Sequence, residues 1–262
     1  MKLYSFLADM IENYVTYRQV SGRTSFCYVK NVIFFDHYCA KKYPFATKLT
    51  QEMVDNWCKQ RPTEINNSCI SRIYPVFNFL RYAKKKGLVD VQIPMAPKST
   101  PRTYIPHAFT KEELQNFFKA CDTMETRKGL NGEIRKITIP VFFRLLYSSG
   151  MRTTEARLLK TRDINLESGV VNIRHSKGYN QHFVVLHDTM LDLMRIYDSA
   201  ICRLIPSRNY FFPTSFDKGY SDPWVGYFFK KLWYQNNQGH ATAYDLRYPY
   251  LNKTCTFRAI IL

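Results

Sequence analysis

Residues 147–157 read Tyr-Ser-Ser-Gly-Met-Arg-Thr-Thr-Glu-Ala-Arg, near the middle of a 262-residue chain. Gly150 is suited to the left-handed conformation that ends a helix, and Thr153 and Glu155 are typical of the first turn of another. The stretch therefore predicts two helices with Arg152 held at the corner between them. An arginine fixed in this way can present its planar guanidinium to two phosphate oxygens. A surface arginine beside a helix cap fits this fragment equally well.

Two further cations follow in order along the chain. Lys177 lies in a Ser-Lys-Gly turn, where its flexible stem can bring the ammonium to a phosphate or to a leaving oxygen. Arg247 ends the run Ala-Tyr-Asp-Leu-Arg, in which Tyr244 and Arg247 share one helix face and Leu246 packs inward. Alone, a lysine in a turn is an ordinary solvated residue, and a Tyr-x-x-Arg pair is a weak signal. The order of arginine, lysine and arginine carries the interpretation.

The composition favours a folded protein that binds a polyanion. The formal net charge is +17, of which residues 1–100 carry +8 and the remainder +9. With 45% hydrophobic and 16% aromatic residues, the chain can bury two cores, so this charge does not belong to a disordered tail. A merely soluble basic surface is the alternative. The size of the excess favours nucleic acid, with binding that weakens as salt rises.

Other sites and compartments find little support in the sequence. The seven cysteines are odd in number and form no Cys-x-x-Cys pair, which argues against a disulfide framework and a zinc site. Asp9 and Glu12 come too early for a signal peptide, and no apolar run reaches membrane-spanning length. We expect a cytoplasmic protein with no zinc site and no membrane partner.

The first half of the chain predicts a helical domain over residues 1–90. Helices are expected over 3–19, over 25–39, from Thr50, and over 66–86, the last with a kink at Pro75. In the second helix we expect an inward face made of Phe26, Val29, Ile33 and Phe34. Residues 91–109 contain four prolines with Lys98 and Arg102, which predicts an extended linker. Its basic residues suit a nucleic acid backbone almost as well as a plain spacer.

The second half, residues 110–262, predicts helices around a small sheet. Thr110 and Glu113 form a capping box that opens a helix. Alternating apolar residues predict three antiparallel strands over 164–166, 170–173 and 183–186, with Lys177 in the second turn. Helices over 191–204 and 225–233 follow. The predicted fold class is mainly α with one small antiparallel β-sheet.

In these motifs the chain resembles the tyrosine recombinases, or phage integrases, up to Arg247. The resemblance implies a core DNA-binding domain at 1–90 and an α+β catalytic domain at 110–262. It implies that Arg152 and Arg247 are the two catalytic arginines, that Glu155 supports the first, and that Lys177 is the catalytic lysine. Family members cut and rejoin double-stranded DNA during site-specific recombination and integration of mobile elements. Their tyrosine nucleophile forms a 3'-phosphotyrosyl link that needs no metal or cofactor.

The chain departs from the family pattern in two places. Tyr244 stands where the family's His-x-x-Arg motif has histidine, which changes the proton-transfer capacity there. His240 is either a partial substitute or a loop residue. Beyond Arg247 nothing resembles the segment that carries the tyrosine nucleophile, Pro249 interrupts the expected helix, and Tyr250 lies too close to Arg247. We therefore expect an incomplete catalytic domain whose reading frame was lost near codon 248, and a chain that binds DNA without cutting it.

Three other interpretations stay open at this stage. The chain can be a DNA-binding-only module that competes with a full-length recombinase, or a general basic nucleic-acid-binding protein. A type IB topoisomerase shares comparable chemistry, although the short helical first domain fits an integrase better. Under the preferred interpretation the partners are double-stranded DNA and full-length recombinase protomers, at the nucleoid of a bacterial cell.

Overall fold

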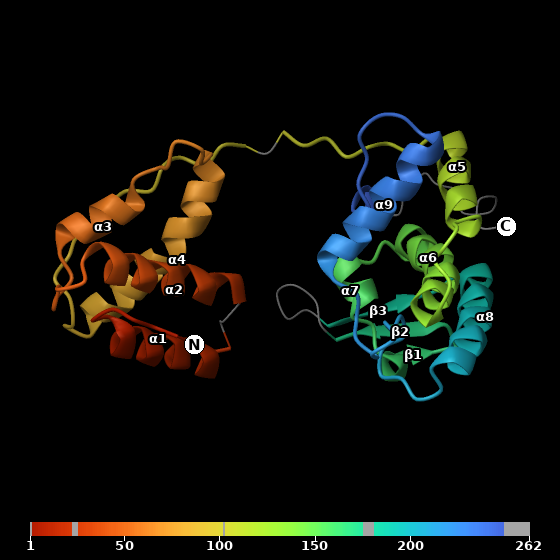
Figure 1. Cartoon of the computed structure of the whole chain (residues 1–262), viewed down its shortest axis with the longest axis horizontal. Coiled ribbons are helices and arrows are strands. Elements are labelled where there is room, and N and C mark those ends of the chain that lie inside the picture. The colour runs from red at the N-terminus through yellow and green to blue at the C-terminus, as the bar shows by residue number, and fades with distance from the viewer. Residues whose placement is uncertain (1, 23–25, 102, 175–180, 249–262) are drawn as a thin grey trace. The chain divides into compact units, whose positions relative to one another are not determined.

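The computed structural model describes residues 2–22, 26–101, 103–174 and 181–248 (Figure 1). The chain divides into two compact units, Met1–Thr103 and Tyr104–Leu262. Lys177, Pro249 and Tyr250 lie outside the described residues. Within the part that is described, no helix is both long enough and apolar enough to cross a membrane.

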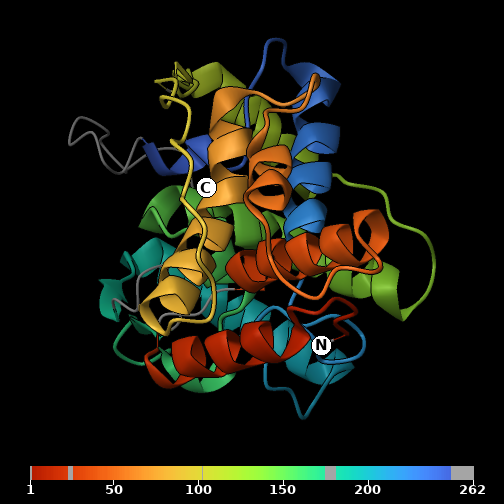
Figure 2. The same cartoon turned by 90° about the vertical axis from the view of Figure 1, so that its left-hand side faces the viewer.

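The first unit consists of helices. These are α1 (Ala8–Val20), α2 (Phe26–Lys42), α3 (Gln51–Cys58) and α4 (Asn66–Lys85). Helix α4 packs across α1 and α2 (Figure 2). The predicted cap of α3 is confirmed, because the side chain of Thr50 accepts a hydrogen bond from the backbone of Met53. Leu7, Ile11, Phe35, Val54, Trp57, Phe79 and Leu80 form the core.

Two details of this unit differ from the sequence prediction. Helix α1 begins at Ala8, not at residue 3, because the buried Asp36 carboxylate accepts hydrogen bonds from the backbone amides of Tyr4 and Ser5 (2.7 and 3.1 Å). In helix α2 the buried residues are Val32, Phe35, Asp36 and Cys39. Of the predicted inward face, Val29 packs against the core and Phe34 is exposed, while the side chain of Phe26 lies outside the description. A nearly continuous apolar run concealed this face, since it supports more than one helical periodicity.

The proline-rich segment after α4 packs on both units in turn. Asn67 exchanges two hydrogen bonds with the backbone of Thr100 (2.7 and 3.0 Å). Further along, His107 contacts Glu113 (3.1 Å), and the ring of His107 lies against that of Trp233. Each end of the segment is therefore bound to a folded unit through specific contacts.

The second unit surrounds a small sheet with helices. The helices are α5 (Lys111–Asp122), α6 (Leu130–Ser149), α7 (Thr153–Arg157), α8 (Asp188–Leu204) and α9 (Asp222–Asn236), with 3-10 turns η1 (Thr161–Asp163) and η2 (Asp245–Arg247). Strands β1 (Ile164–Asn165), β2 (Val170–Ile173) and β3 (His182–Val185) pair antiparallel in the order β1-β2-β3. The predicted fold class, sheet and Thr110 capping box are confirmed.

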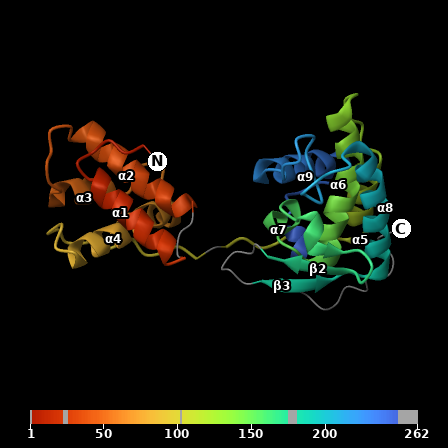
Figure 3. The ribbon, with the colours of Figure 1, turned by 90° about the horizontal axis from the view of Figure 1, so that it is seen from below.

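Helix α6 is the centre of this unit. It packs against α5, α7, α8 and η2, and it supplies Ile139, Phe142, Phe143, Leu145 and Leu146 to the core. Helix α7 lies between α9 and the sheet (Figure 3). The carboxyl end of α6 is thus placed next to α7 and η2, the two short elements that carry Arg152 and Arg247.

A buried ion pair joins α4 to the loop after α3. The guanidinium of Arg72 donates to both carboxylate oxygens of Glu64 (2.8 and 2.7 Å) and to the carbonyl oxygen of Lys59 (3.0 Å). The side-chain hydrogen bonds from Arg72, followed by the one from the backbone amide of Arg61, lower the pKa of Glu64 from its usual value to about 2. The ionised carboxylate is therefore part of the folded state.

This pair predicts an acid-dependent contribution to stability. Because the pKa of Glu64 is lower in the folded chain, its contribution is complete above about pH 4.5 and is lost as the pH falls towards 2. Glu64→Gln should lower the melting temperature at pH 6, and its difference from wild type should shrink towards zero at pH 2. Circular dichroism melts across this range measure the effect. Glu12→Gln, on the exposed side of α1, is the control, and an equal pH profile for the two variants would contradict the assignment.

Candidate functional site

The corner predicted at residues 149–152 is present. Helix α6 ends at Ser149, and Gly150 adopts the left-handed conformation (φ 63°) while its amide donates to the carbonyl oxygen of Leu146 (3.2 Å). The buried side chain of Met151 anchors the turn in the core, and Arg152 is the residue that caps α7. The backbone thus fixes where the Arg152 side chain starts.

A buried carboxylate orients Arg152. Glu155 accepts the Arg152 backbone amide at Oε2 (2.8 Å) and Nη1 of its guanidinium at Oε1 (2.6 Å). The Glu155 side chain is 2% exposed, whereas that of Arg152 is 39% exposed. Glu155 therefore holds the arginine from the protein interior while the guanidinium still faces solvent.

Arg247 is attached to the same corner. Its Nε donates to the carbonyl oxygen of Gly150 (2.7 Å), and its Nη1 donates to the hydroxyl of Tyr244 (3.0 Å). Tyr244 and Arg247 share one face, as predicted, although the element is a 3-10 turn instead of an α-helix. Leu246 points into the core as expected. The structure thus brings together Arg152, Glu155, Tyr244 and Arg247 around Gly150.

Asp245 and Tyr104 hold the turn that carries Arg247. The fully buried Asp245 carboxylate accepts hydrogen bonds from the Tyr104 hydroxyl (2.7 and 2.6 Å) and from the amide and hydroxyl of Thr242 (2.8 and 3.0 Å). Burial, followed by the hydrogen bond to Asp245, raises the pKa of Tyr104. Sequence reasoning missed this pair because Tyr104 lies 141 residues before Asp245. For Asp245, the sequence offered one signal: it stands two residues before Arg247 in the Asp-Leu-Arg run.

The other predicted residues, Lys177 and His240, make no described contact with this cluster. Lys177 belongs to the connection between β2 and β3 but lies outside the described residues. His240 is exposed in the loop between α9 and η2. Its proposed substitution for the histidine of the family motif stays a prediction.

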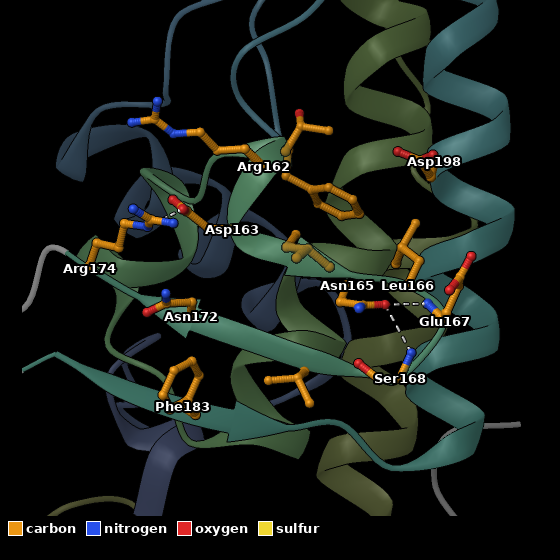
Figure 4. Close-up of a pocket in the computed structure, with 14 residues that line it drawn as sticks. Arg162, Asp163, Asn165, Leu166, Glu167, Ser168, Asn172, Arg174, Phe183 and Asp198 are labelled. Atoms are coloured by element: carbon orange, nitrogen blue, oxygen red, sulfur yellow. Dashed lines mark hydrogen bonds and ion pairs between the residues drawn. The ribbon is translucent and has the colours of Figure 1, made fainter.

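A cavity lies along the sheet (Figure 4). It has a volume of about 850 Å³, and its lining includes Arg162, Asp163, Asn172, Arg174 and Phe183. Arg152 and Arg247 are not among its lining residues. The arginine cluster therefore lies outside this cavity, at a corner where Arg152 and Arg247 are partly exposed.

Residues 107–252 match the model of the phage integrase family, which covers more than half of the chain. The chain belongs to the phage integrase family. Among its curated relatives is tyrosine recombinase XerD of Rickettsia prowazekii. The two sequences are 24% identical over 82% of this chain and 71% of the relative. It is 28% identical to tyrosine recombinase XerA of Thermococcus kodakarensis over 44% of the chain and 37% of the relative.

The fold is also that of solved family structures. The XerH site-specific recombinase, in a post-cleavage complex with its difH substrate, matches 84% of this chain and 65% of its own with a TM-score of 0.59 at 16% identity. The chain spans 48% of the length of a Sinorhizobium fredii relative and 37% of the Thermococcus one. These comparisons establish the family and the fold.

The contact between Tyr104 and Asp245 predicts a measurable loss of stability. Tyr104→Phe removes a hydroxyl that donates to a buried carboxylate, so the second unit should lose about 1.5–3 kcal/mol. Urea unfolding followed by the fluorescence of Trp224 and Trp233, both in this unit, measures the change. Tyr234→Phe, on an exposed part of α9, is the matched control. Equal midpoints for the two variants would show that the hydroxyl contributes nothing.

Proposed function

We propose that this family member is a site-specific DNA recombination protein whose residues Arg152 and Arg247 bind a phosphodiester of duplex DNA. The observation that carries the proposal is the bond from Arg247 to the carbonyl of Gly150, two residues before Arg152. It gathers two partly exposed arginines at one corner. Two such groups suit the oxygens of one phosphate and the charge that develops when it is attacked.

The charge of the chain and the contents of related structures support this assignment. A net charge of +17 distributed over both halves fits a polyanionic ligand. Structures with the same fold contain XerH on its difH substrate and dimers of lambda integrase on a COC' core site. Lambda integrase has also been solved as a tetramer on a Holliday junction. We accordingly propose duplex DNA and recombinase protomers as the partners of this chain.

The chemistry that we propose follows the family mechanism. In a chain that also carries the family's tyrosine, whose oxygen bonds to phosphorus as the 5'-oxygen leaves, Arg152 and Arg247 would stabilise the pentavalent phosphate. Glu155 would fix the first arginine, and Lys177 would protonate the departing 5'-oxygen. Tyr244 accepts a hydrogen bond from Arg247, so its own hydroxyl proton is free to be donated to a phosphate oxygen. Tyrosine thus replaces the hydrogen bond of the family's histidine without its positive charge. No step requires a metal or cofactor.

We further propose that these 262 residues bind DNA but do not cut it. The described tyrosines beside Arg247 are Tyr244, whose hydroxyl is bonded to that arginine, and Tyr248, whose ring packs on Tyr244. Neither stands at the spacing of the family's nucleophile. In a bacterial cell, we expect these residues to occupy recombination sites of a mobile element at the nucleoid.

Arg247→Gln provides the cleaner test of phosphate binding, because both described partners of Arg247 are uncharged and no buried charge is left unpaired. We expect affinity for duplex DNA to fall by roughly three- to tenfold and the slope of log K against log salt to fall by about 0.9. Fluorescence anisotropy with a labelled duplex at several salt concentrations measures both. Arg195→Gln, an exposed arginine on α8, is the control. Equal losses for the two variants would favour a general basic nucleic-acid-binding protein.

The absence of cleavage can be tested on selected DNA. Duplexes that the chain retains from a randomised pool should bind tightly and yet form no complex that survives denaturing electrophoresis. A protein–DNA adduct that resists detergent and is destroyed by protease would overturn this part of the proposal. Replacing Tyr248 and Tyr250 separately by phenylalanine would then identify the attacking residue.

A further inference from the structure

A second arginine is held by a buried carboxylate at the end of β2. Arg174 directly follows the last residue of this strand, and its Nε lies 2.6 Å from Oδ1 of Asp163 in η1 (Figure 4). The Asp163 side chain is 5% exposed and that of Arg174 is 46% exposed. Within the described parts of the chain, the polar contact of Arg174 is made through Nε, and no hydrogen bond occupies its terminal nitrogens. The fork of the guanidinium therefore faces solvent with its stem fixed.

This arrangement has the same form as that of Arg152 and Glu155. In both, a nearly fully buried carboxylate contacts a guanidinium whose side chain is about two fifths exposed or more. The two pairs are also neighbours, since Glu155, Asp163 and Arg174 line one small cavity between α7 and β2. The Arg174 pair thus lies beside the arginine cluster described above.

Other arginines of this unit are used differently. Arg144 forms a two-pronged contact with Asp122 and is mostly buried. Arg195 is as exposed as Arg174, at 47%, but its three nitrogens donate to the carbonyl oxygens of Leu166 and Glu167 and to Asp192. Those arginines connect parts of the protein to one another. Arg174 retains two donor groups that no described protein acceptor uses.

We propose that Arg174 is an additional phosphate-binding residue, which contacts a backbone phosphate next to the one held by Arg152 and Arg247. This inference rests on the proposed function, since it assumes duplex DNA at the arginine cluster. Asp163 is its positioning residue, because the ion pair between its buried carboxylate and Nε restricts the side chain of Arg174. A planar fork with a fixed stem loses little freedom when it binds two phosphate oxygens.

The test is a double variant that conserves net charge. Arg174→Gln alone would leave the buried Asp163 unpaired, with a risk of misfolding. Asp163→Asn combined with Arg174→Gln removes both charges, so the long-range field of the protein stays the same. The matched control, Asp192→Asn with Arg195→Gln, removes another arginine–aspartate pair from the same unit. Arg174→Lys keeps the charge but lacks the fork, and it provides a variant that does not disturb Asp163.

Binding to a short labelled duplex of arbitrary sequence is measured for all variants between about 50 and 200 mM salt. At the lowest salt concentration, we expect the Asp163/Arg174 double variant to bind several-fold more weakly than wild type. Its slope of log K against log salt should be smaller by about 0.9, so the ratio of the two affinities should fall by roughly 3.5-fold across this range. Arg174→Lys should lie between it and wild type. The Asp192/Arg195 control should match wild type in affinity and slope.

The outcomes separate this inference from the proposed function. If wild type binds DNA and Arg247→Gln weakens it, but the Asp163/Arg174 variant behaves like its control, the role of Arg174 is overturned and the arginine cluster stands. Wild-type affinity in Arg174→Lys, together with a loss in the double variant, would show that a positive charge suffices and would overturn the role of the planar fork. If wild type shows no salt-dependent binding, the proposed function itself fails.

Discussion

The hydrogen bond from Arg247 to the carbonyl oxygen of Gly150 is the contact on which the candidate site depends. It connects segments 97 residues apart, and it requires the Gly150 carbonyl to point away from the end of α6. The left-handed conformation of Gly150 provides this direction, at a cost of about 1 kcal/mol or more for a residue with a side chain. Because Arg152 follows two residues later, any shift of this corner would displace both arginines together.

Buried carboxylates set the geometry around that corner. Glu155, Asp163 and Asp245 are each almost fully buried, and each is held in contact with a group that must be oriented. A buried charge without a partner is costly, whereas a paired one adds little net stability. We infer that these residues contribute specificity of conformation more than stability. They make one arrangement of the arginines much more favourable than its alternatives.

Local signals in the sequence predicted much of the fold, whereas contacts between distant segments were not predictable. The Thr110 capping box, the Gly150 corner and the antiparallel strands all depend on residues a few positions apart, where backbone chemistry decides the outcome. The start of α1 depends on Asp36, whose partners Tyr4 and Ser5 lie 32 and 31 residues away. The contacts of Tyr104 with Asp245 and of Arg174 with Asp163 likewise required the tertiary structure.

The contact made by Tyr104 changes where the functional unit begins. Composition alone placed the start of the second domain at residue 110, after the prolines. Yet Tyr104 donates to the carboxylate beneath Arg247, while His107 and Phe109 pack their rings against Trp233. A fragment that starts at residue 110 would leave Asp245 buried without one of its donors. The last part of the proline-rich segment is therefore a structural component of the arginine cluster, and its prolines restrict the conformations from which Tyr104 must be ordered.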